Sequence, residues 1–333
     1  MNKLPVLTFF LCTLFLFGCN NDLELIAPQK DIPVVYGIFS KQNTDHYLRV
    51  ERGFIDETIN AETLAQDPNN LAYEDAIVRV KVNSTPYILE RVNGNEEGLQ
   101  REEGFFANDP NYLYKLADFS FANADNVVVE IDRGQGFDLV ETQSAIPIID
   151  NFTLKSPNPA QGQKVGIRTD DTFFALRYDA PTEAKIFDAV LTFHYFEFPN
   201  SGGEPEAKSV TWTVARNQER DDNNEFVLSR REGRDFFNLL LAEIPVNSSV
   251  TRKFRKFSVE IGAGGQAFAD YIALTQANTG ITSSQEVPNF SNLTEGLGLV
   301  SSKFVLNVDS LDITGTMRTE LNTGDLLSDL NFE

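Results

Sequence analysis

Apolar and polar residues alternate with a period of two along most of the chain after residue 33. The runs are short, rich in β-branched and aromatic residues, and separated by turn-forming residues. Because side chains of a strand point alternately to its two faces, the pattern predicts half-buried β-strands. A polar insertion at 55–73 interrupts the pattern and is expected to hold one short helix. The predicted strands are 34–39, 46–52, 76–82, 87–92, 112–116, 126–131, 137–141, 173–178, 187–198, 209–214, 254–261 and 297–306.

The pattern divides the chain into two parts. Seven predicted strands within 33–145 fit an antiparallel β-sandwich that resembles the immunoglobulin fold in architecture, although the Cys-Trp-Cys pattern of antibody domains is absent. Pro and Gly are concentrated at 155–162, so we place the boundary near residue 145. Residues 146–333 are predicted to form a second β-rich domain with one or two helices, at 234–244 and 266–277, where apolar residues recur at helical spacing.

The first residues follow a different pattern. Met1-Asn2-Lys3 is followed by an apolar run over 4–17, which is shorter than the roughly 20 residues that span a bilayer. A charged start, a short apolar core and a small residue before the cut are typical of a signal peptide, which we assign to residues 1–18. Leu16-Phe17-Gly18-Cys19 resembles the lipobox of bacterial lipoproteins. The resemblance implies that Cys19 becomes residue one of the mature chain and carries acyl chains such as palmitate.

Cysteine usage agrees with this assignment. Of the two cysteines, Cys12 leaves with the signal peptide, so the mature chain has one thiol and no internal disulfide. Acylation explains the remaining cysteine, whereas an ordinary cleaved signal would leave it as a coincidence. Residues 19–32 are predicted to form a lipidated tether. Asp22 and Glu24 within it fit either an export signal to the outer face of the outer membrane or a solvated linker, so the periplasmic and cell-surface faces both stay open.

The charge of the chain restricts its partners. The formal net charge is −21 at pH 7 and no basic cluster is evident in the sequence. Such acidity disfavours binding to nucleic acid and adhesion to anionic lipid headgroups. We therefore expect the lipid on Cys19 to attach the protein to the membrane.

Residues that carry catalytic or metal chemistry are scarce. The mature chain has two histidines, His46 and His194, each expected to be a half-exposed strand residue. A zinc site would need both histidines from separate domains, and a Gly-x-Ser-x-Gly nucleophile turn is absent. We therefore predict no catalytic residue, no metal and no cofactor, and a protein that is not an enzyme. The 49 Asp and Glu residues keep a carboxylate-dependent hydrolase open as an alternative.

Two local motifs resemble ligand sites. Residues 262–267, Gly-Ala-Gly-Gly-Gln-Ala, match part of the dinucleotide fingerprint, but no second parallel strand is predicted after them, so a strand-to-helix turn is expected. The run Asp221-Asp222-Asn223-Asn224-Glu225 concentrates oxygen ligands that would suit calcium. It lacks the glycine and distal Glu of an EF-hand loop, so a solvated hairpin tip is the default and calcium binding stays open.

Several segments resemble an uncharacterised family of Bacteroidota envelope lipoproteins. They are the lipobox, 33–39 with 46–50, 67–78, and 287–300, which contains Asn-Leu-Thr-Glu-Gly-Leu-Gly. The glycines of this last segment are expected to adopt positive φ before the final strands. Members resemble companions of outer-membrane receptors, which implies a TonB-dependent receptor as partner.

The expected function is a non-catalytic envelope lipoprotein of the outer membrane, acting as a binding or accessory component of nutrient uptake. The alternatives are an extracytoplasmic hydrolase that uses carboxylates, or a structural scaffold of the envelope. The single tryptophan, Trp212, disfavours a carbohydrate-binding surface, because such surfaces rely on exposed aromatic faces.

Overall fold

The computed structural model describes residues 31–53, 60–134, 136–170, 172–277 and 289–333. Its strands are β1 (Ile32–Phe39), β2 (His46–Gly53), β3 (Ile77–Val82), β4 (Thr85–Ile88), β5 (Glu90–Asn93), β6 (Tyr112–Leu116), β7 (Asn126–Asp132), β8 (Val140–Glu141), β9 (Ile146–Pro147), β10 (Leu154–Ser156), β11 (Phe173–Tyr178), β12 (Ile186–Pro199), β13 (Glu206–Glu219), β14 (Val227–Glu232), β15 (Val250–Gly264) and β16 (Leu297–Leu311). Its helices are α2 (Ala61–Ala65), α3 (Pro68–Leu71), η2 (Pro159–Gln161), α4 (Gly233–Glu243), α5 (Gln266–Ala277), α6 (Gly315–Thr323) and η3 (Asp325–Leu330). The predicted mainly β fold, a sandwich followed by a β-rich part with helices, is confirmed.

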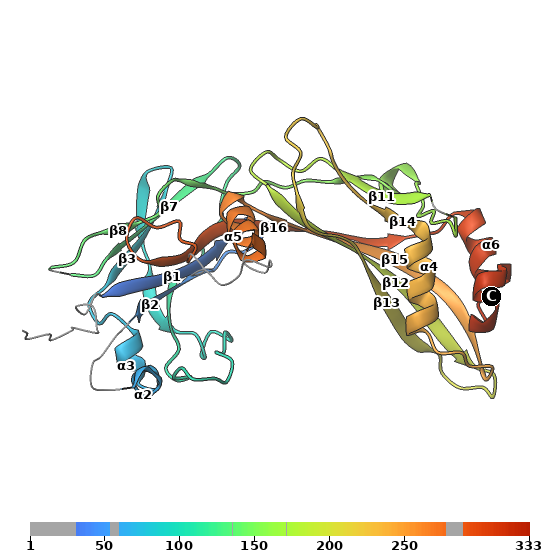
Figure 1. The fold of residues 1–333 in the computed structure, drawn as a ribbon, viewed down its shortest axis with the longest axis horizontal. Helices are drawn as coiled ribbons and strands as arrows, with labels where there is room; N and C mark the ends of the chain where they lie inside the picture. The colour runs from blue at the N-terminus through green and yellow to red at the C-terminus, as the bar shows by residue number, and fades with distance from the viewer. Residues whose placement is uncertain (1–30, 54–59, 135, 171, 278–288) are drawn as a thin grey trace, which may run out of the picture.

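Two lobes share one long sheet (Figure 1). The N-terminal lobe, β1 to β9 with residues 291–302, is a sandwich. One of its layers is the part of the eight-stranded sheet ordered β16-β1-β2-β6-β5, and the other contains β4-β3-β7-β8, with β9 paired to β7. Burial alternates along β1, so Val35 and Phe39 enter the core while Tyr36 faces outward. This is the period-two pattern of the sequence realised in space.

The polar insertion of this lobe forms two short helices, where one was expected. Asn60 caps α2 by accepting a hydrogen bond from the backbone N–H of Glu62. Asp67 caps α3 in the same way, and Pro68 occupies the first helical position, where its missing N–H costs nothing. Because a second cap and a proline follow α2 at once, the insertion is divided into two turns of helix.

Two predicted strands of the same lobe are changed. The predicted strand 87–92 is split at Leu89, whose side chain is buried, so β4 and β5 belong to different sheets. The predicted strand 137–141 is reduced to β8. Phe137 lies outside that strand and stacks under the guanidinium of Arg133, 4.9 Å from ring centroid to Cζ.

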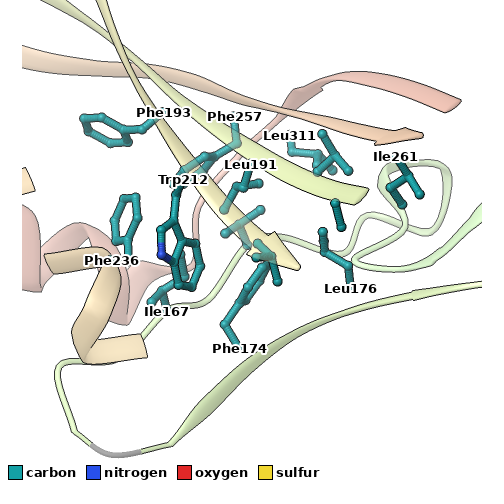
Figure 2. Packing of buried hydrophobic residues seen from close by; sticks show 14 of the residues in the cluster. Ile167, Phe174, Leu176, Leu191, Phe193, Trp212, Phe236, Phe257, Ile261 and Leu311 are labelled. Carbon is teal, nitrogen blue, oxygen red and sulfur yellow. The ribbon is translucent and has the colours of Figure 1, made fainter. Parts of the chain in front are cut away.

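The C-terminal lobe packs the three-stranded sheet β10-β11-β14 and helix α4 against the long strands β12, β13 and β15. The buried residues of α4 recur at helical spacing and include Phe236, as the sequence predicted for this helix. Phe236 lies beside Trp212 in the core, with ring centroids 5.5 Å apart (Figure 2). Trp212 is 2% exposed and therefore belongs to the core and not to a surface. Among the described residues, the structure contains no helix that combines the length and the apolarity needed to cross a membrane.

Strand β16 runs from one lobe to the other (Figure 1). Its first residues pair in parallel with β1, from Leu297 opposite Val34 to Ser302 opposite Phe39. Its later residues pair antiparallel with β15. The predicted antiparallel sandwich is thus completed by one parallel strand that comes from the far end of the sequence. The two lobes consequently share a continuous ladder of backbone hydrogen bonds.

The segment before β16 holds the start of this strand in the N-terminal lobe. The side chain of Asn292 donates to the carbonyl of Val300 at 2.7 Å and accepts from its N–H at 3.0 Å. Gly296 and Gly298 have φ of +99° and +136°, which confirms the positive φ expected for this motif. A Cβ on Gly298 would lie 1.8 Å from the carbonyl oxygen of Val35. The motif therefore allows β16 to approach β1, which is a folding role.

Candidate functional site

An apolar cavity of about 530 Å³ lies in the N-terminal lobe beside α2 and α3. Its walls come from the start of β1, the end of β2, the two helices and the loop 94–111. We call it the aromatic cavity. It is lined by Val34, Glu51, Arg52, Gly53, Ala61, Glu62, Ala65, Leu71, Phe105 and Phe106.

Backbone and amide hydrogen bonds hold the loop 94–111 against the lobe. The buried side chain of Asn111 donates to the carbonyl of Leu99 at 2.7 Å, across the base of the loop. The N–H of Ala107 donates to the carbonyl of Ala65 in α2 at 2.8 Å. This second bond ties the loop to the helical insertion, so the two segments form one wall of the cavity.

The mouth of the aromatic cavity is apolar with a charged rim. Phe105 is 69% exposed and Phe106 is 47% exposed. The guanidinium of Arg101 lies over the ring of Phe106, 4.8 Å from its centroid, and forms an ion pair with Glu51 at 2.8 Å. Two neighbouring aromatic side chains in water at the edge of a cavity are typical of a site where a ligand or partner binds.

The first described residue, Asp31, lies next to this cavity. Its carboxylate accepts from Arg52 Nε and Arg133 Nη1, both at 2.8 Å, and from the hydroxyl of Tyr73 at 3.0 Å. We call these four residues the Asp31 clamp. Burial raises the pKa of Tyr73 to about 12, so its hydroxyl stays a donor. Arg52 also lines the cavity, and the clamp therefore fixes the start of the described chain at the cavity wall. Cys19 itself lies outside the described residues.

His46 departs from the expectation of a half-exposed residue, because it is 2% exposed. Its Nε2 donates to the carbonyl of Phe119 at 3.0 Å, and its ring packs against Phe39 and Phe121. Burial lowers the pKa of His46, since the charged form would lose its hydration. The alternating pattern could not show this, because the aromatic segment that covers the ring follows 73 positions later.

His194 is half-buried, as expected, and lies on the outer face of the long sheet. Its Nε2 is 2.8 Å from Oγ of Ser258 on the adjacent strand β15. The pKa of His194 is lowered by burial and by the nearby Lys256. Asp309 on β16 completes a Ser, His and Asp grouping that sequence reasoning missed. Its carboxylate is bound by Lys256 Nζ at 2.6 and 2.5 Å, so it does not orient the imidazole as the acid of a hydrolase triad does.

Two carboxylates meet on β7 and β8, where Glu130 and Glu141 are direct cross-strand neighbours. Burial raises the pKa of Glu130, but its ion pair with Lys81 and its bond to Glu141 hold it below the ordinary value. The hydrogen bond to Glu130 raises the pKa of Glu141. The two carboxyl groups of a glycosidase flank the scissile bond and stand roughly 5 to 9.5 Å apart, the wider spacing leaving room for the attacking water. A pair in direct contact therefore does not fit that reaction.

The acidic run 221–225 forms an exposed turn, as predicted, but not the tip of a hairpin, because the flanking strands β13 and β14 belong to different sheets. The carboxylate of Asp221 accepts from the N–H of Asn223 at 3.0 Å and from the side-chain amides of Asn223 and Asn224. These bonds lower its pKa, with the backbone N–H of Asn223 as the main cause. No group of three or more His, Cys, Asp or Glu side chains suited to a metal is found within the described residues.

The glycine motif 262–267 joins β15 to α5 as a strand-to-helix turn, as predicted. Strand β15 pairs antiparallel with both β12 and β16, so the parallel unit of a dinucleotide fold is not formed there. A Cβ on Gly264 would lie 3.0 Å from Ile186, and a Cβ on Gly265 would lie 3.2 Å from Ser302. These glycines serve close packing between strands and helix.

Comparison with known proteins does not assign a family. The sequence matches no protein-family model, and no curated protein matches it. The resemblance to Bacteroidota envelope lipoproteins therefore stays a prediction. The aromatic cavity and its position beside Asp31 are the features from which a function can be argued.

Proposed function

We propose that the protein is a non-catalytic lipoprotein of the outer membrane, anchored through Cys19, that serves as a binding or accessory component of nutrient uptake. In this proposal the aromatic cavity docks onto a receptor embedded in the same membrane, with a TonB-dependent receptor as the expected partner. The protein acts by contact and catalyses no reaction.

The observation that carries the proposal is the position of the aromatic cavity beside Asp31, the first described residue, which in this proposal follows the lipidated tether. Asp31 follows Cys19 by 12 positions. An extended chain spans at most about 3.6 Å per residue, so the cavity wall lies within roughly 40 Å of the lipid. A partner that meets Phe105 and Phe106 is therefore expected close to the membrane surface.

Charge supports a protein partner over a lipid surface. The chain has a formal net charge of −21, which opposes contact with anionic headgroups. Phenylalanine and arginine are enriched in protein–protein interfaces relative to the rest of the surface, and Phe105, Phe106 and Arg101 meet at this mouth. Docking through this apolar mouth would remove both rings from water.

The test is recovery of partners from detergent-solubilised outer membrane, with the full-length protein as bait. The unmodified protein should recover a receptor in a one-to-one ratio. The double variant Phe105→Ser, Phe106→Ser should not recover it. Ile88→Ser is the matched control, since Ile88 is 70% exposed in the same lobe but lies on β4, outside the cavity. Protease treatment of intact cells beforehand reports which membrane face carries the protein.

The outcomes separate the candidate functions. Recovery of a TonB-dependent receptor that depends on the two phenylalanines supports the proposal. Recovery that is unchanged in the double variant contradicts docking through the aromatic cavity. A bait that comes down alone and is protected from protease contradicts the receptor partnership, and a periplasmic scaffold or a carboxylate-dependent hydrolase then becomes the better interpretation.

A further inference from the structure

A second cavity, of about 700 Å³, lies in the C-terminal lobe on the outward face of β11 and β14. It includes the acidic turn 221–225, whose chemistry the proposed function does not use. We call it the arginine cavity. It is lined by Arg177, Gln218, Glu219, Asp221, Asn224, Glu225, Phe226, Val227, Leu228 and Arg230.

Two arginines of this cavity are stacked on aromatic rings. The guanidinium of Arg177 lies 3.8 Å from the ring centroid of Phe226, and that of Arg230 lies 5.4 Å from the ring centroid of Phe173. Within the described residues, neither arginine forms an ion pair with a carboxylate. Because neither guanidinium is paired with a carboxylate, both keep donors available for a ligand, although the chain as a whole is rich in acids.

The strand register brings the two arginines to one face. Arg177 on β11 is opposite Leu228 on β14, and Arg230 is two positions further along β14. Diagonal neighbours of this kind have Cβ atoms at most about 7 to 8 Å apart. The guanidinium of Arg177 leans toward Phe226 and that of Arg230 toward Phe173 at the other end of the register, so each offers its donors to a separate part of a ligand on this face. Leu228 between them is 45% exposed and supplies an apolar contact.

The acidic side of the cavity offers the opposite charge. Asp221 is engaged by the amides of its own turn. Glu219 and Glu225 form no ion pair in the part of the chain that the structure describes, and both are exposed. A cavity with free guanidinium groups on one side and free carboxylates on another fits a ligand that carries both charges.

We propose that the arginine cavity binds a short peptide with free termini. The C-terminal carboxylate bonds to Arg177, with Arg230 further along the same face, the N-terminal ammonium faces Glu219 and Glu225, and an apolar side chain packs on Leu228. The volume lies within the roughly 300 to 1,000 Å³ of small-ligand sites. This inference goes beyond the proposed function and does not rest on it, because the site is in the other lobe and needs no receptor.

The experiment is isothermal titration calorimetry with the purified full-length protein in detergent, without any receptor. The probes are alanyl-alanyl-phenylalanine, its C-terminal amide and its N-acetyl form. The free peptide should bind, and each blocked form should bind at least about tenfold more weakly, since each loses one charged contact. Arg177→Gln with Arg230→Gln should weaken the free peptide by at least the same factor. Arg216→Gln, an exposed arginine of β13 outside the cavity, should change nothing.

Three results would overturn the proposal. These are no binding heat from the free peptide at about 1 mM, equal binding of the amide, or equal binding of the acetylated form. The peptide series uses the unmodified protein, so it decides the matter even if the double variant fails to fold. A negative calorimetry result would not affect the test of receptor recovery through the aromatic cavity, so each proposal can be contradicted without the other.

Discussion

In the N-terminal lobe the carboxylate of Asp31 accepts hydrogen bonds from three side chains. In the C-terminal lobe the guanidinium of Arg252 donates to three acceptors. The Asp31 clamp gathers two arginines and a tyrosine around one acid, whose side chain is 11% exposed. Arg252, which is 0% exposed, donates to Glu197 at 2.7 Å and to the carbonyls of Leu330 and Pro245 at 2.7 and 2.8 Å. Each arrangement holds one end of the described chain.

The two arrangements differ in what they protect. The Asp31 clamp lies at the rim of a cavity, and it holds the first residue that the structure describes. Arg252 lies inside the core, and it holds residues that are part of that core, since Phe332 is 4% exposed and forms a bridge with Arg252 itself. We infer that the C-terminal clamp serves stability, whereas the N-terminal clamp mainly positions a functional surface.

The largest effect is expected for Arg252→Met. The change keeps most of the apolar stem but leaves Glu197 and two buried carbonyls without their donor, which should cost about 3 to 5 kcal/mol in the free energy of unfolding. Urea unfolding followed by circular dichroism measures this loss. Arg255→Met is the control on the same strand, and because Arg255 is exposed it should cost no more than about 0.5 kcal/mol. Equal losses for both variants would contradict the clamp.

A smaller loss is expected for Asp31→Asn. The amide has one acceptor oxygen where the carboxylate has two, so Arg133, whose side chain is 4% exposed, loses its charged partner. The expected cost is about 1.5 to 3 kcal/mol in the same unfolding measurement. Asp75→Asn, at an exposed carboxylate in the same lobe, is the control and should be nearly neutral. A neutral Asp31→Asn would contradict the expected stabilisation by the clamp.

The smallest expected effect is a pH dependence of stability, which should be larger for His46 in the N-terminal lobe than for His194 in the C-terminal lobe. Burial lowers the pKa of His46 below its ordinary 6.5, so the unfolded chain binds a proton that the fold does not. Stability is therefore full above pH 6.5 and falls as the pH drops below it, by at most about 1.4 kcal/mol per unit.

His46→Phe should remove this acid sensitivity. At pH 7 it should cost about 1 kcal/mol, because the carbonyl of Phe119 loses its donor. Unfolding curves between pH 7 and pH 5 measure both effects. His194→Gln, in the other lobe and half-buried, should change the slope less. Identical slopes for the unmodified protein and His46→Phe would contradict the assignment.

Much of the fold could be predicted because its local signals are strong. Alternation over 32–39 or 186–199 reports burial directly, and the apolar stripe of 233–243 marks α4. The split between β4 and β5 was not visible, because Leu89 continues the strand-like composition while the backbone changes sheet. The residues 227–232 and 315–323 were missed because their charged or polar composition hides a strand and a helix that tertiary contacts stabilise.

Neither candidate cavity could be read from the sequence. The aromatic cavity joins 34 with 105, and the arginine cavity joins 177 with 230. Their side chains are ordinary in the sequence, since Phe105 follows a glycine in a polar loop and Arg230 alternates normally along its strand. The acidic turn 221–225 was noticed for its oxygen atoms, but the pair of arginines across from it depends on the register of β11 and β14.

By itself the sequence determined the strand pattern, the paucity of histidine and cysteine, the apolar start with its resemblance to a lipobox at 16–19, and the glycines at 296 and 298. These properties depend on neighbours along the chain or on composition alone. Only the tertiary structure decided that β16 serves both lobes, that Arg252 is a buried clamp, and which side chains form each cavity. The physical reason is that these contacts join residues tens to hundreds of positions apart, and their partners are chosen by sheet register and core packing.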